Sequence, residues 1–192
     1  MSDDIFEDRQ RAAEGQWARA RDAELIEKLR NKEQREALTV ALAGALRVNV
    51  PELLERVIDL GVTADTAPAL LQAPLVQVAW AGASVTREER EAVLRLAAAG
   101  GITATSPAGA RLAEWLETRP ADGLFATAVD VIKAGLSALP PAERDARVAG
   151  IAAACGEVAS ASGGLGKTLG LSSGVSAQED SVVDRILARL RG

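Results

Sequence analysis

The sequence contains no histidine and only one cysteine, Cys155. Without histidine there is no Ser-His-Asp or Cys-His nucleophile, no histidine general base and no zinc site that uses histidine. One cysteine cannot build a thiolate cluster or an internal disulfide, which is typical of a reducing compartment and predicts a cytoplasmic protein. Catalysis by carboxylates or lysines remains possible, and so does a Ca²⁺ or Mg²⁺ site with oxygen ligands. We therefore expect a protein that is not an enzyme, with no catalytic residue and no cofactor.

Aromatic residues, basic charge and long apolar runs are also scarce. The chain has three Trp, two Phe and no Tyr, and it lacks the alternating β-branched and aromatic runs that indicate strands. Its net charge of −5 predicts no nucleic-acid partner, because such partners need a basic stripe. No apolar run approaches the roughly 20 residues that span a bilayer, so we expect no membrane insertion. The acidic start at residues 1–4 is unlike a signal peptide.

Hydrophobic residues, many of them alanine, make up 48% of the 192 residues. Alanine and leucine favour helices, and alanine lets helices approach closely. The sequence therefore predicts an all-α fold with a packed core.

Charge divides the chain into two expected parts. In residues 1–36, ten residues are acidic and eight are basic, so half of them are charged. We expect residues 1–35 to form a charged amphipathic helix and residues 36–192 to form the helical domain. Trp17 lies on the thin apolar seam of the charged helix with little around it to pack against. This makes Trp17 a candidate anchor for a binding partner.

Start and stop signals divide the second part into helices. Proline at a helix start, glycine at a helix end and Ser or Thr before a first turn all recur. The expected helices cover residues 36–49, 51–61, 64–81 with an interruption at Pro74, 86–100, 106–120, 125–136, 141–158 and 176–190.

Two capping boxes have matching surroundings. Residues 85–89 (Val-Thr-Arg-Glu-Glu) line up with residues 175–179 (Val-Ser-Ala-Gln-Glu). Either capping boxes recur by chance, as they do in helical proteins, or a helical hairpin was duplicated. Both interpretations stay open at the level of sequence.

Several motifs have an ordinary structural interpretation. Residues 161–168 (Ala-Ser-Gly-Gly-Leu-Gly-Lys-Thr) match a loose phosphate-binding loop, but no strand precedes them, so we expect a loop between helices. Glu88, Glu89 and Glu91 suit a first helical turn, where carboxylates complement the helix dipole, better than a cation site. Cys155 lies on an apolar stripe and is expected to be buried and inert. Trp80 and Trp115 are expected to pack in the core.

Residues 74–90, the Gly100-Gly101-Ile102 stop and the glycine-rich loop of residues 161–175 resemble the TerB-like helical domain of tellurite-resistance proteins. The resemblance covers about residues 36–190. It implies a compact bundle of about seven helices with a pseudo-twofold repeat and, as one alternative function, a metal-responsive stress-response module. That family commonly has an Ala-Asp-Gly step before its helix cap, and the Asp is a candidate metal ligand. Here the step is Ala81-Gly82-Ala83, so we expect no metal site.

The N-terminal segment carries a second resemblance. Phe6-Glu7-Asp8-Arg9, Arg11-Ala12, Glu14, Trp17 and Glu24-Leu25 resemble the start of the zeta-type inhibitor subunit of alphaproteobacterial F-type ATP synthases, which has Phe at the place of Trp17. In those inhibitors this helix wedges between catalytic subunits. The resemblance implies a binding or regulatory protein that contacts a protein partner, the catalytic subunits of an F-type ATP synthase, through five residues: Phe6, Arg9, Arg11, Glu14 and Trp17.

Overall fold

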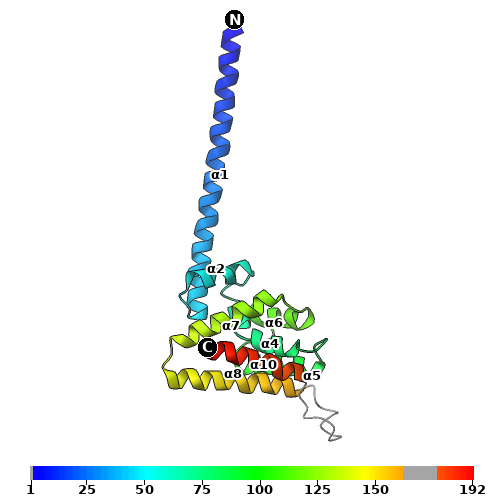
Figure 1. The fold of residues 1–192 in the computed structure, drawn as a ribbon. Helices are drawn as coiled ribbons and strands as arrows, with labels where there is room; N and C mark the ends of the chain where they lie inside the picture. Colours follow the sequence, from blue (N-terminus) through cyan, green and yellow to red (C-terminus); the bar gives the residue numbers. More distant parts are fainter. Residues whose placement is uncertain (1, 162–176) are drawn as a thin grey trace. The chain divides into compact units, whose positions relative to one another are not determined.

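The computed structural model describes the backbone of residues 2–161 and 177–192, and the side chains of these residues except 2–15 and 18. Within these ranges the chain forms nine helices and no strand (Figure 1). The expected all-α helical bundle is confirmed. The chain divides into two compact units, Met1–Val40 and Ala41–Gly192.

One continuous helix, α1 (Ser2–Leu46), makes up the first unit and enters the second. The helix expected over residues 36–49 is thus the last part of α1 rather than a separate element. Lys, Arg, Glu and Gln are nearly as good helix formers as Ala, so the change from charged to apolar composition alters burial without interrupting the backbone. The helix ends before Arg47, which has a positive φ of 54°.

Three short helices open the second unit: α2 (Pro51–Asp59), α3 (Ala67–Leu71) and α4 (Ala73–Ala79). Proline occupies the first or second position of each, where its missing N–H removes no helical hydrogen bond. Gly61 follows α2 with a φ of +70°, as expected for a C-terminal glycine. The expected interruption lies at Gln72, between α3 and α4.

The first capping box starts α5 (Arg87–Ala99) as expected. The Thr86 hydroxyl accepts a hydrogen bond from the backbone N–H of Glu89 at 3.2 Å. In return the Glu89 carboxyl accepts one from the Thr86 N–H at 2.7 Å. The helix ends at the expected glycines, and Gly101 has a φ of +91°. The Ser176 half of the second capping box lies outside the described residues.

The start of α6 (Pro107–Glu117) requires glycine at position 109. The Ser106 hydroxyl caps the helix by accepting a hydrogen bond from the Gly109 N–H at 3.0 Å. A Cβ atom on Gly109 would lie 2.1 Å from the backbone oxygen of Thr103. Because such a distance is far below van der Waals contact, the preceding loop can approach α6 only over a glycine.

The remaining helices are α7 (Asp122–Ser137), α8 (Pro141–Ala161) and α10 (Ala177–Arg191). Helix α7 packs against α4 and α10, and α8 and α10 lie side by side (Figure 1). The expected spacing of Phe125, Val129, Ile132 and Leu136 is confirmed, since all four are buried. Burying such a side chain stabilises the fold by about 1.5–3 kcal/mol.

All described side chains of the apolar core belong to the second unit. Its first buried residue is Leu42 and its last is Leu190. The expected burial of Cys155 is confirmed, and this burial raises the pKa of its thiol to about 12, which disfavours the reactive thiolate. Trp115 is buried. The indole N–H of the half-buried Trp80 donates a hydrogen bond to the backbone oxygen of Trp115 at 2.8 Å.

Among the described helices, no single one is long and apolar enough to cross a membrane, and only the bent pair of Arg19–Leu46 with Pro51–Asp59 would meet those criteria together.

Candidate functional site

The five predicted partner-binding residues all lie on α1. The structure gives a helical backbone for Phe6, Arg9, Arg11 and Glu14, and their side chains lie outside its description. Phe6 and Trp17 are eleven residues apart, close to three turns of about 3.6 residues, so they share one face of the helix. Arg11 lies six residues from Trp17 and well off that face. The five residues therefore do not form one surface on a straight helix.

Trp17 is exposed on the helix. Its side chain is 67% exposed, and the Arg21 guanidinium lies over the indole ring, 5.5 Å from the ring centre. This cation–π contact holds a positive charge beside the ring. The indole thus lies at the surface of the first unit with one charged neighbour.

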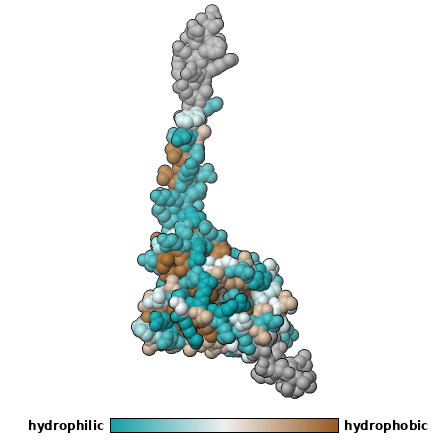
Figure 2. Space-filling view, viewed as in Figure 1, coloured by the Kyte–Doolittle hydropathy of each residue, from teal (hydrophilic) through white to brown (hydrophobic). Residues whose placement is uncertain are grey.

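An apolar stripe lies farther along α1. Leu25, Ile26 and Leu29 are each exposed by half or more of their surface. These three residues belong to the apolar seam predicted from the sequence, but they were not among the predicted partner-binding residues. Every described side chain from residue 16 to residue 37 is exposed, and Figure 2 shows apolar patches among hydrophilic side chains on this helix. Beside the stripe, the Lys28 ammonium pairs with Glu24 at 2.6 Å.

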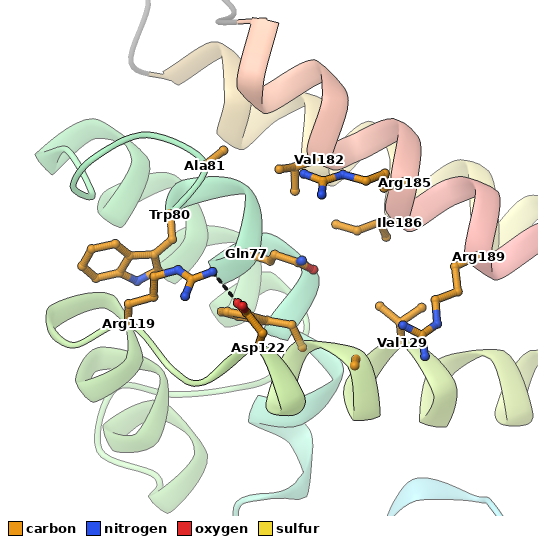
Figure 3. Close-up of a pocket in the computed structure, with 12 residues that line it drawn as sticks. Gln77, Trp80, Ala81, Arg119, Asp122, Val129, Val182, Arg185, Ile186 and Arg189 are labelled. Atoms are coloured by element: carbon orange, nitrogen blue, oxygen red, sulfur yellow. Dashed lines mark hydrogen bonds and ion pairs between the residues drawn. The ribbon is translucent and has the colours of Figure 1, made fainter.

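A second feature, the arginine pocket, lies within the helical unit. It is a cavity of about 460 Å³ between α4, α7, α10 and the loop before α7 (Figure 3). Its lining combines apolar and cationic side chains: Gln77, Trp80, Ala81, Arg119, Asp122, Phe125, Ala126, Val129, Val182, Arg185, Ile186 and Arg189. Trp80, expected only to pack, therefore also lines a cavity.

Two of the three arginines in this pocket have carboxylate partners. Arg119 pairs with Asp122 at 2.6 Å and lies over the Phe125 ring at 5.6 Å (Figure 3). Arg189 donates two hydrogen bonds, at 2.8 and 3.1 Å, to one oxygen of Asp130. The other oxygen of Asp130 accepts a hydrogen bond from Arg56 of α2 at 2.8 Å.

Asp130 thus links three helices through its two oxygens. Burial by itself would raise the pKa of its carboxyl, but the hydrogen bonds from Arg56 and Arg189 outweigh burial and lower that pKa. The carboxylate is therefore held in its charged form. The sequence could not reveal this pairing, because the three partners come from α2, α7 and α10.

A buried carboxyl pair lies elsewhere in the unit. Glu89 and Glu179 are each 4% exposed, and their side chains are hydrogen bonded to each other. Burial is the main cause that raises the pKa of Glu89, and the second carboxyl adds to it, although the hydrogen bonds from Thr86 oppose this. The raised pKa favours the neutral form of Glu89, which lessens the repulsion between the two carboxyls.

Two acidic residues near the start of α5 also have ordinary structural roles. Glu91 pairs with Arg87 at 2.8 Å, and Glu89 closes the capping box. The part of the chain that the structure describes holds no group of three or more Cys, Asp or Glu placed to bind a metal ion. The phosphate-loop-like motif lies, apart from Ala161, outside the described residues.

Comparison with models of known protein families finds no match to this chain. Curated proteins and solved structures give no significant match either.

Proposed function

We propose that this protein is a non-enzymatic binding or regulatory protein whose α1 helix contacts a helical surface of a protein partner. The observation that carries the proposal is the exposure of Trp17 and of the apolar stripe, Leu25, Ile26 and Leu29, on a helix segment whose described side chains are all exposed. A helix of this composition gains little by folding alone, because most helical stability comes from packing an apolar face.

The spacing of the stripe favours a helical groove or a second helix as the contact. Residues 25, 26 and 29 occupy neighbouring positions on one face, and anchors at i, i+3 and i+4 are typical of a helix that binds in a groove. The pair between Lys28 and Glu24 borders that face and would lie at the rim of such a contact. Apolar anchors would supply most of the binding free energy, and rim charges would set orientation.

The sharper form of the proposal names the partner. The resemblance of the N-terminal segment to the zeta-type inhibitor supports an F-type ATP synthase, with Phe6, Arg9, Arg11, Glu14 and Trp17 near the catalytic subunits. Phe6 and Trp17 share a helix face, which suits insertion between two subunits. Leu29 lies twelve residues from Trp17, which turns it to another face of the helix, so the apolar stripe would contact a separate surface of the partner.

ATP hydrolysis by a purified F-type ATPase tests the proposal directly. The full chain should slow hydrolysis, and the double substitution Leu25→Ser with Leu29→Ser should abolish the effect. Leu71→Ser is the matched control, because Leu71 is also an exposed leucine but lies on α3. Unchanged hydrolysis with the full chain would remove the ATPase proposal. Equal effects of both leucine substitutions would remove the role of the stripe.

A further inference from the structure

The arginine pocket has a charge opposite to that of the whole protein. Its lining holds three arginines and one carboxylate, Asp122, whereas the chain carries a net charge of −5. Asp130 lies behind Arg189 and is shared with Arg56, so it does not reverse this excess. A local positive charge on an acidic protein concentrates anions at that place.

Arg185 is the arginine available to a ligand. Its Nε–H donates to the backbone oxygen of Ser181, in its own helix, at 3.1 Å. No carboxylate among the described residues pairs with it, in contrast to Arg119 and Arg189. The two terminal nitrogens of its planar guanidinium can therefore receive a carboxylate in a two-point hydrogen bond. Figure 3 shows the side chain of Arg185 extending along α10 toward Val182, with Ile186 below it in this view.

The lining of the pocket combines polar side chains with an apolar base. Phe125, Val129, Val182 and Ile186 form this base and are buried, so each exposes little surface to the pocket. Trp80 adds its indole, which is held in place by the hydrogen bond to Trp115. A hydrated inorganic ion gains no binding free energy from apolar surface in the lining. An aromatic or branched aliphatic group gains about 25 cal/mol per Å² of apolar surface that it buries.

We propose that the arginine pocket binds a small organic acid, with its apolar body against the Trp80 indole and its carboxylate held by Arg185, while Arg119 adds positive charge to the same lining. The volume of about 460 Å³ is in the range of small-molecule sites, about 300–1,000 Å³. The Trp80 indole would recognise the apolar body of the ligand, and the guanidinium groups would recognise its charge. The proposal is independent of the function proposed for α1.

Isothermal titration calorimetry of the full chain tests this site with 2-naphthoate as the probe. Two compounds separate the parts of the recognition: 2-naphthamide keeps the ring without the charge, and inorganic phosphate keeps the charge without the ring. We expect 2-naphthoate to bind at one site, and each of the other two to bind at least about tenfold more weakly. Equal binding of the amide, tight binding of phosphate, or no saturable binding of 2-naphthoate would overturn the proposal.

Arg185→Gln should weaken the binding of 2-naphthoate at least about tenfold, since the variant loses the two-point hydrogen bond. Arg119→Gln provides a second, independent substitution with the same expected direction. Arg87→Gln is the matched control, because Arg87 is exposed on α5 and does not line the pocket. Arg185 and Arg119 are exposed, so the melting temperature should stay unchanged in all three variants. Equal losses for Arg185→Gln and Arg87→Gln would mean a general charge effect and would overturn the site.

Discussion

The side chains of Glu89 and Glu179 are hydrogen bonded to each other in the interior of the helical unit, although both are acids. Each is the last residue of one of the two matched capping-box segments that the sequence shows. The pair therefore joins the starts of α5 and α10. Burial, together with this second carboxyl, raises the pKa of Glu89 and so favours its neutral form.

Glu89→Gln should change the pH dependence of stability. The pKa of Glu89 is raised in the folded protein above its ordinary value of 4.5, so its contribution to stability is complete below that value and is lost as pH rises through the raised pKa. The glutamine side chain can keep the capping hydrogen bond through its amide oxygen. Its amide N–H can donate to Glu179 at any pH, because it needs no protonated carboxyl. We expect the variant to equal or exceed the original protein in stability near neutral pH, measured by urea unfolding across the acidic and neutral range.

Glu88→Gln is the matched control for that experiment. Glu88 is the neighbouring residue and is exposed, so this variant should keep the pH dependence of the original protein. A Glu89→Gln variant that is clearly less stable at neutral pH would contradict the expected cost of ionising the buried Glu89 carboxyl.

Asp130→Asn should destabilise the helical unit with the opposite dependence on pH. The pKa of Asp130 is lowered from its ordinary value of 3.8, so its contribution is present above that value and is lost as pH falls through the lowered pKa. Loss of the two arginine partners should cost about 1 kcal/mol at neutral pH, since both guanidinium groups are partly solvated. Thermal unfolding measures this cost. Asp122→Asn, whose carboxyl is highly exposed, should cost much less, and an equal loss would contradict the special position of Asp130.

Trp17→Ala should weaken capture of the partner without changing the fold. An anchoring aromatic contributes 2 kcal/mol or more to many interfaces, so a loss of at least about tenfold, or roughly 1.4 kcal/mol, is expected. The melting temperature should stay nearly constant, because the indole is mostly exposed. Surface plasmon resonance against a purified F-type ATPase measures the first quantity and calorimetry the second.

Trp17→Phe is the conservative variant at the same position. The zeta-type inhibitors have Phe there, so this substitution should keep most of the affinity. A large fall in melting temperature with unchanged capture would instead show that Trp17 packs within this protein.

Residues 36–192 should fold without the preceding segment. Among the described side chains the buried apolar core begins at Leu42, so removal of residues 1–35 takes away none of its known members. Circular dichroism during heating should give a cooperative transition close to that of the full chain. An insoluble truncated protein, or a loss above about 3 kcal/mol of a typical stability of 5–15 kcal/mol, would assign the charged helix to the core.

Divalent cations should bind weakly. The residue before Ala83 is Gly82, where the TerB-like family has an Asp, and the protein has no histidine. Titration calorimetry with Ca²⁺, Mg²⁺, Zn²⁺ and Mn²⁺ should give dissociation constants no tighter than about millimolar, the weak end of carboxylate sites. A stoichiometric micromolar site would favour the metal-responsive stress function instead.

Most helix boundaries could be predicted from the sequence because their signals are local. Thr86 and Glu89 form their capping box within one turn, and Gly61 ends α2 through its own φ angle. The spacing along α7 likewise depends only on which residues face one way. The continuity of α1 was not predicted, because composition changes near residue 36 although charged and apolar residues there continue one helix.

The arginine pocket could not be predicted, because its parts meet only through tertiary packing. Arg119 belongs to the loop before α7 and Arg185 to α10, and no periodicity relates the two positions. The only local signal is the four-residue spacing of Arg185 and Arg189, which puts both on one face of a helix. That spacing is common on exposed helices, so it does not by itself indicate a pocket.

Because Cys155 is buried, its chemical modification can be used to measure local opening of the helical unit. The only thiol of the chain is inaccessible and has a raised pKa, so a maleimide or disulfide reagent can modify it only when α8 separates from its neighbours. The rate of modification then measures the free energy of that separation, as amide exchange does for a backbone group. A cysteine introduced at an exposed position of α1, such as Gln16, would react with the reagent while the buried native thiol stays unmodified. One helix could thus carry a fluorescent or spin label in the otherwise unaltered chain.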